Sequence, residues 1–140
     1  MKKTLCAVSL ILSSLSSFAS GPGGGTLVCE MPYYESRHSN GLNVASNHGV
    51  HITNDTNKSY TYHIYYSSSL DQGNGEKEVA SKHISRVIEP GQTFSDQQQI
   101  SGFFSTPDKG HFKTYAKTSV SVHDKNIMTP CVYKNKFRSY

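Results

Sequence analysis

The chain of 140 residues has no tryptophan, only three cysteines and no long apolar run. Its most apolar stretch, residues 5–12, is too short to cross a bilayer, which takes about 20 residues. The sequence also lacks a Gly-x-Ser-x-Gly elbow and a His-Glu-x-x-His helix. These absences leave no recognisable catalytic motif, cofactor loop or complete metal motif, and we therefore expect a protein that is not an enzyme.

Residues 1–19 have the pattern of an export signal. Lys2 and Lys3 form a positive start, residues 5–12 form a short apolar region, and Ser17 and Ala19 supply the small side chains for cleavage after Ala19. Cleavage leaves about 120 residues, enough for one domain. We expect a flexible Gly-rich leader over residues 20–25, a single domain over 26–140 and no transmembrane segment in the mature form. The short Met-Lys-Lys start favours a Gram-negative bacterium, with the protein periplasmic or secreted.

Export also decides how the cysteines are interpreted. Cys6 is lost with the signal, which leaves Cys29 and Cys131 near the two ends of the domain. Two cysteines in an oxidising compartment predict one disulfide, which closes a loop of about 100 residues. A redox-active pair is the alternative, but such pairs usually lie close together as Cys-x-x-Cys. We therefore predict a structural disulfide.

The best-specified stretch runs from Gly49 to Ser69. Residues 60–66 alternate tyrosine and isoleucine with Thr61, His63 and Tyr65, which is the period of a strand lying between core and water. An Asn- and Thr-rich turn separates this strand from the apolar residues before it, so the two runs form either a hairpin or a sandwich corner.

Turn signals divide the rest of the chain into further short strands. We expect strands at 26–31, 83–88, from 93, at 112–123 and at 131–137, and a type II turn at Glu89–Gln92. The polar residues 33–46 are expected to form a loop or a hairpin turn. The segment from Ser67 to Lys82 is rich in Ser, Gly, Glu and Lys, and is expected to add nothing to the core.

About seven strands at short spacing, without an amphipathic helix, predict an all-β fold. The expected architecture is an antiparallel β-sandwich of immunoglobulin-like type. The missing tryptophan and the terminal cysteines mean that the Cys-Trp-Cys signature of a true antibody-type domain is lacking.

Histidine and tyrosine are the two residue types in excess. If the Gly49–Ser69 stretch closes as a hairpin, His51 and His63 face each other, and with His48 they form a zinc or copper site. The alternative is that the histidines are scattered over solvent faces. Tyr65 points away from the core, and the adjacent pair Tyr33 and Tyr34 must place one ring outward, so these three side chains are candidates for contact with a partner.

The formal charge of +4 is spread evenly along the chain, and two of the lysines belong to the signal. This distribution argues against a nucleic-acid partner. The sequence therefore predicts an exported, non-catalytic module without a cofactor that binds a protein or carbohydrate partner through an exposed, tyrosine-containing sheet face or its loops. A periplasmic zinc- or copper-binding protein is the alternative.

Overall fold

The computed structural model describes residues 23–30, 37–38, 41–105 and 110–139. The strands are β1 (Gly24–Glu30), β2 (Arg37–His38), β3 (Gly41–Thr53), β4 (Tyr60–Asp71), β5 (Glu76–Ile88), β6 (Thr93–Ser105), β7 (Gly110–Val122), β8 (Lys125–Asn126) and β9 (Cys131–Ser139). The described part of the chain holds no helix long and apolar enough to cross a membrane.

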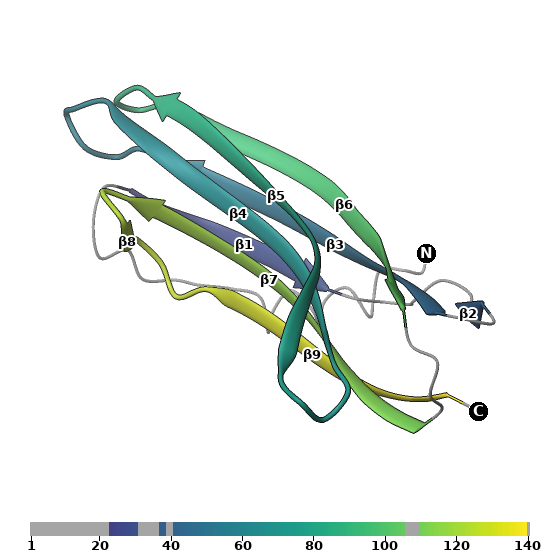
Figure 1. Cartoon of the computed structure of the whole chain (residues 1–140). Coiled ribbons are helices and arrows are strands. Elements are labelled where there is room, and N and C mark those ends of the chain that lie inside the picture. Colours follow the sequence, from purple (N-terminus) through teal and green to yellow (C-terminus); the bar gives the residue numbers. More distant parts are fainter. Residues whose placement is uncertain (1–22, 31–36, 39–40, 106–109, 140) are drawn as a thin grey trace, which may run out of the picture.

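The strands form two antiparallel sheets that pack face to face (Figure 1). In the first sheet β3 lies in the centre, between β6 on one side and β1 and β2 on the other. In the second sheet the order is β5-β4-β7, and β8 and β9 both pair with the far side of β7. The prediction of an all-β antiparallel sandwich is confirmed, and the arrangement is consistent with the immunoglobulin-like type.

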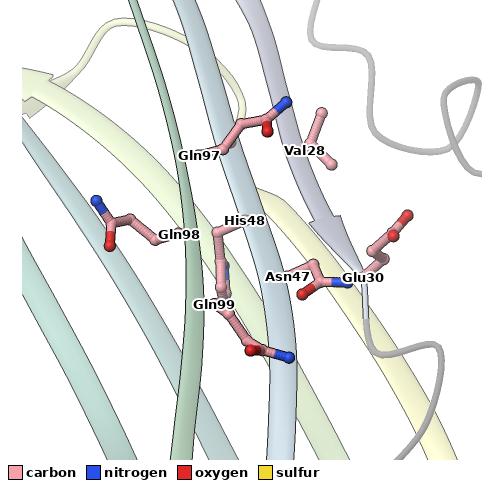
Figure 2. A pocket seen from close by; sticks show the side chains of 8 residues that line it. Val28, Glu30, Asn47, His48, Gln97, Gln98 and Gln99 are labelled. Carbon is pink, nitrogen blue, oxygen red and sulfur yellow. The ribbon is translucent and has the colours of Figure 1, made fainter.

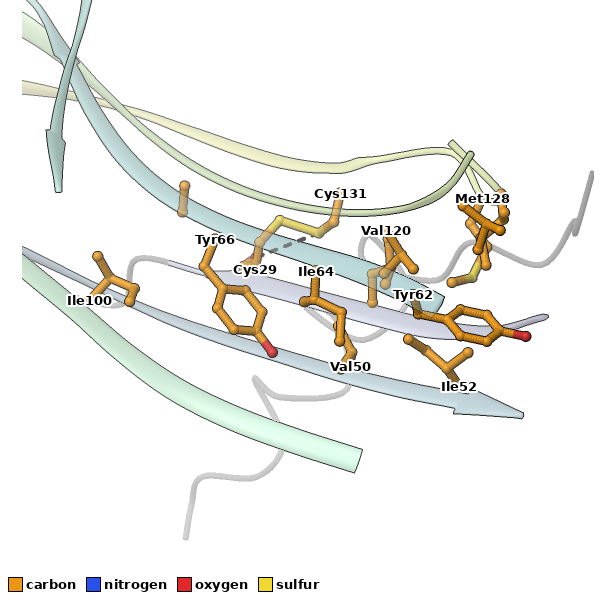
Figure 3. Packing of buried hydrophobic residues seen from close by; sticks show 14 of the residues in the cluster. Cys29, Val50, Ile52, Tyr62, Ile64, Tyr66, Ile100, Val120, Met128 and Cys131 are labelled. Atoms are coloured by element: carbon orange, nitrogen blue, oxygen red, sulfur yellow. Dashed lines mark hydrogen bonds between the residues drawn. A yellow bond between two sulfur atoms is a disulfide. The ribbon is translucent and has the colours of Figure 1, made fainter. Parts of the chain in front are cut away.

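The core lies between the sheets and follows the alternation of the strands. Tyr62, Ile64 and Tyr66 of β4 are fully buried and face Val50 and Ile52 of β3 (Figure 3). The predicted inward and outward faces of residues 60–66 are therefore correct. Tyr62 and Tyr66 are among the largest fully buried side chains and supply much of the bulk of the core.

The predicted disulfide is present and joins the two sheets. Cys29 on β1 and Cys131 on β9 are bonded, with their Cα atoms 5.9 Å apart (Figure 3). Because β1 is an outer strand of one sheet and β9 of the other, this bond connects the two layers at their side.

The stretch from Gly49 to Ser69 is a sandwich corner. β3 pairs with β1, β2 and β6, whereas β4 pairs with β5 and β7, so the chain changes sheets between Thr53 and Tyr60. The hairpin alternative, with β3 and β4 paired, is wrong. Both strands carry their bulkiest apolar side chains on one face, and that pattern fits two strands facing each other across a core as well as two strands paired within a sheet.

Two segments expected to be irregular are strands. For residues 33–46 a loop or a hairpin turn was expected. β2 and β3 do pair antiparallel there, with His38 opposite Gly41, but β3 already begins at Gly41 and buries Val44, Ala45 and Ser46. β4 continues to Asp71, and Leu70 is completely buried although residues 67–82 were expected to add nothing to the core. Both segments are rich in small polar residues, some of them at inward positions. The sequence therefore lacks the alternation of apolar and polar side chains by which a strand is recognised. β1 also begins at Gly24, earlier than the expected Thr26.

The turn at Glu89–Gln92 is as predicted. The Gln92 amide donates to the Glu89 carbonyl over 3.0 Å, and Gly91 has a φ of 79° at the position where a type II turn requires a positive φ. This turn leads the chain from β5 in one sheet to β6 in the other.

Candidate functional site

The outer surface of the second sheet carries the exposed tyrosine. The register pairs Thr61 with Val87, His63 with both Ser85 and Ser121, and Tyr65 with both His83 and Ser119, so these side chains share the outward face. Further along β7, Lys117 pairs with Val132 of β9. We call this outer surface the tyrosine face and define it by His63, Tyr65, His83, Val87, Tyr115, Lys117 and Val132.

Tyr65 lies in the centre of this face, with 37% of its surface exposed. Its hydroxyl donates to the carboxylate of Glu78 on β5, and this hydrogen bond, together with partial burial, raises the pKa of the phenol. The side chain is therefore neutral at ordinary pH and is held at its polar end. A ring fixed in this way loses little conformational entropy when a partner covers it.

One ion pair lies beside an aromatic ring on the tyrosine face. Lys117 Nζ lies 2.7 Å from Glu76 Oε2 and 5.7 Å from the centre of the Tyr115 ring. Because the lysine and the glutamate are each about a third exposed, this ion pair adds at most about 1 kcal/mol to stability. The tyrosine face therefore combines aromatic and aliphatic surface with both signs of charge.

Two histidines meet on the same face. His63 Nδ1 on β4 lies 3.3 Å from His83 Nε2 on β5, and the two rings are stacked with their centres 5.3 Å apart. The Ser85 hydroxyl lies 3.0 Å from the same His63 nitrogen. His63 is partly buried and His83 is exposed.

The three histidines predicted to form a metal site are not brought together. His51 is exposed on the outer surface of the first sheet, where its Nδ1 lies 2.7 Å from the Ser95 hydroxyl. His63 belongs to the second sheet, on the far side of the core. Within the described residues no group of three or more His, Cys, Asp or Glu side chains is arranged to hold a metal. The predicted arrangement depended on the hairpin, and the sandwich corner separates β3 from β4.

His48 points into the core between the sheets. Its Nε2 lies 2.7 Å from the Ser46 hydroxyl and its Nδ1 lies 2.9 Å from the hydroxyl of Thr118 on β7. Burial lowers the pKa of the imidazole to about 4, so the ring is neutral at pH 7. Thr118 also donates to the Val28 carbonyl. His48 therefore links the two sheets beside the disulfide.

The outer surface of the first sheet has a different character. A hollow of about 450 Å³ lies over Gly49, where the strand has no side chain, and Asn47, Gln97 and Gln99 line it with amides (Figure 2). Val28, Glu30, His48 and Gln98 complete the lining. No Tyr or Phe is found among these described lining residues, so the hollow offers hydrogen bonds without a flat ring for a partner to cover.

The other two candidate tyrosines, Tyr33 and Tyr34, lie outside the described residues, as do residues 1–22 with the predicted signal. Sequence reasoning did not select Glu78, His83 or Tyr115 as members of a site. His83 and Tyr115 lie on strands that the sequence predicts, whereas Glu78 lies in the segment that was expected to be irregular. The register that places all three on the same face as Tyr65 is set by pairing between strands and has no local signal in the sequence.

No protein-family model and no curated protein matches the chain. Among solved structures it is similar to the β-glucuronidase of Bacteroides uniformis, with 8% identity and a TM-score of 0.49, over 81% of this chain and 13% of that one. Another β-glucuronidase, from glycoside hydrolase family 2, gives 12% identity and a TM-score of 0.47, over 79% and 11%.

A protein from Arabidopsis thaliana is similar over 86% of this chain and 83% of its own, with 10% identity and a TM-score of 0.43. The chain spans only a small part of the β-glucuronidases it resembles.

Proposed function

We propose that the protein is an exported, non-catalytic binding module that engages a protein partner through the tyrosine face. One observation carries the proposal. Of the four large hydrophobic side chains that are exposed among the described residues, Tyr65, Val87 and Val132 lie on this face, and only Phe103 lies elsewhere. Val87 and Val132 lie on the two outer strands of that sheet, β5 and β9, with Tyr65 between them, so the three side chains mark a broad face with the tyrosine ring at its centre. Apolar side chains exposed on a single face support its use as a surface that another molecule covers.

The details of the face support a protein as the partner. Tyrosine supplies a large contact area with few rotatable bonds, and the hydrogen bond from Tyr65 to Glu78 fixes the ring before binding. The aliphatic side chains of Val87 and Val132 and the Lys117–Glu76 ion pair match the mixed apolar and polar surfaces of other proteins. A glycan is the alternative partner, and it would stack mainly on the Tyr65 ring.

Export is part of the proposal. The Cys29–Cys131 disulfide supports it because such bonds persist in oxidising compartments such as the bacterial periplasm and the extracellular space. The signal-like residues 1–19 point the same way. The site of action is then the envelope of a Gram-negative cell or its surroundings.

Site-specific photocrosslinking tests the proposal. A photoreactive amino acid at Ser119, beside Tyr65 on β7, should give defined crosslinked proteins in cells, and one at Thr93, on the outer surface of the first sheet, should not. The additional substitution Tyr65→Ser should reduce the Ser119 crosslinks at least tenfold, because it removes the central ring. The variant should still fold, because Tyr65 lies on the outer face of the sheet and not in the core between the sheets.

Two results would contradict the proposal. Crosslinks of equal yield from both positions, or crosslinks that survive Tyr65→Ser in a variant shown to be folded by circular dichroism, would remove the tyrosine face as the docking surface. Binding of the purified protein to a glycan array that is lost in Tyr65→Ser, without any protein crosslink, would replace the protein partner by a glycan.

A further inference from the structure

The two histidines of the tyrosine face are placed as ligands for one metal ion. They come from neighbouring antiparallel strands and are diagonal neighbours, since His63 pairs with Ser85 and Tyr65 pairs with His83. This position brings His63 Nδ1 to 3.3 Å from His83 Nε2. In a neutral pair one facing nitrogen donates its N–H and the other accepts it. A metal ion binds to both facing nitrogens once that proton has moved to the second nitrogen of its own ring, and it replaces the contact of the Ser85 hydroxyl with His63 Nδ1.

The separation of the nitrogens matches what a metal ion requires. Zinc binds histidine nitrogen at about 2.0–2.1 Å, so two imidazole nitrogens on one ion lie about 2.9–3.4 Å apart for bond angles between square and tetrahedral. The observed 3.3 Å falls within this range. The backbone of β4 and β5 therefore already holds the two imidazoles at the distance that binding needs.

The surroundings leave the site open. A hollow of about 540 Å³ lies beside His63 and is lined by this residue, His123 and Asp124, together with Ser59, Tyr60 and Thr61, whereas His83 is not part of its lining. His123 and Asp124 both have a positive φ, 54° and 62°, which is uncommon for residues other than glycine. This turn presents an imidazole and a carboxylate towards the hollow, while the direct nitrogen contact is confined to His63 and His83.

We propose that His63 and His83 form a binding site for a divalent transition-metal ion that prefers imidazole, namely Zn²⁺ or Cu²⁺. The two protein ligands leave the remaining coordination positions to water or to groups of a bound partner. The affinity is therefore weaker than in closed structural sites with four protein ligands. This proposal uses the geometry of the pair alone and does not depend on a protein partner for the tyrosine face.

Titration of the untagged mature protein with Zn²⁺ and with Cu²⁺ tests the site, using calorimetry together with the NMR signals of the histidine side chains. We expect saturable binding of one ion, with Zn²⁺ shifting the His63 and His83 signals and paramagnetic Cu²⁺ broadening them selectively. The substitutions His63→Asn and His83→Asn should each weaken binding at least tenfold. The matched control His51→Asn, which changes an exposed histidine of the other sheet, should leave the affinity within twofold. Mg²⁺, which prefers oxygen ligands, should not bind.

The proposal is overturned if neither ion shifts or broadens the two histidine signals, or if His83→Asn binds as the unchanged protein does. Both histidines lie on the surface, and near-ultraviolet circular dichroism verifies that the variants are folded. The Tyr65→Ser variant separates this site from the proposed function. It should keep its metal affinity while it loses its crosslinks, so either proposal can fail without the other.

Discussion

His48 shows how one buried side chain couples the two layers of the sandwich. Its ring accepts or donates hydrogen bonds at both nitrogens, with Ser46 on its own strand and Thr118 on β7 of the opposite sheet. A histidine with both nitrogens occupied inside the core must stay neutral, because protonation would place an unpaired charge away from water. The structural role of His48 is therefore also a source of acid sensitivity.

We predict that His48 makes the protein less stable in mild acid. The pKa of the imidazole is lowered from 6.5 to about 4 in the folded protein, so between these values the unfolded chain binds a proton that the folded chain does not. Stability from this group is complete above pH 6.5 and is lost as the pH falls towards 4. The free energy of unfolding should drop by about 2 kcal/mol between pH 7.5 and pH 5 from His48 alone.

Urea unfolding at a series of pH values measures this effect, and His48→Gln is the comparison. The glutamine amide offers one donor and one acceptor without a titrating group. The variant should be less stable at pH 7.5 but should lose about 2 kcal/mol less than the unchanged protein on going to pH 5. Equal pH dependence in the two proteins would show that His48 does not titrate in this range.

At the scale of elements, β5 of one sheet and β6 of the other meet along one side of the sandwich. Among the described strands β5 pairs with β4 alone and β6 with β3 alone, yet β5 and β6 approach each other closely at Gly102. A Cβ atom built on Gly102 would lie 2.7 Å from Val79 Cγ1 and 2.9 Å from the Val79 carbonyl oxygen. Glycine at this position therefore allows the edges of the two sheets to meet.

We predict that Gly102→Ala destabilises the protein by about 1–3 kcal/mol, because the added methyl group must push β5 away from β6. In a strand without such a contact, replacing glycine by alanine usually stabilises the fold slightly, so the sign of the change is informative. Thermal or urea unfolding measures it. The control Ser101→Ala, at an exposed neighbouring position, should change stability by less than about 0.5 kcal/mol.

A Gly102→Ala variant as stable as the unchanged protein would mean that β5 and β6 have room to separate.

Gly49, which lies under the hollow of the first sheet, is less crowded than Gly102. A Cβ atom there would approach the Asp96 carbonyl oxygen to 3.3 Å, which is tight but less severe.

At the scale of the whole molecule, the disulfide and the core act together. Cys29 and Cys131 are 102 residues apart in sequence, and their bond closes nearly the whole described domain into one loop. His48 and Thr118, which pair with Cys29 and Cys131 in their respective ladders, add a hydrogen bond between the layers just inside the disulfide. On the side where β1 meets β9, the two layers are therefore joined by both a covalent bond and a buried hydrogen bond.

We predict that replacing both cysteines by serine lowers the free energy of unfolding by about 4 kcal/mol, since the unfolded chain then regains the entropy of an open loop. Urea unfolding of the double variant and of the oxidised protein measures the difference. Reduction of the unchanged protein with dithiothreitol should cost a similar amount. A loss below about 1 kcal/mol would assign the stability of the sandwich to its core alone.

The sequence by itself determined the fold class, the disulfide and the faces of the best strands. Alternation in residues 60–66 separates Tyr62, Ile64 and Tyr66 from Tyr65, because neighbouring side chains of a strand point to opposite sides whatever the strand pairs with. The Glu89–Gln92 turn was predictable for a similar reason, since Pro90 and Gly91 restrict their own backbone dihedrals.

Only the tertiary structure decided which strands are neighbours. The hairpin alternative placed His51 opposite His63, whereas the structure separates them by the core and brings His63 to His83 instead. It also brings Glu78 to Tyr65 and places the polar end of β4 inside the sandwich. Period-two alternation gives each strand two faces but carries no information about its partner or register, and both are set by packing between segments far apart in the chain.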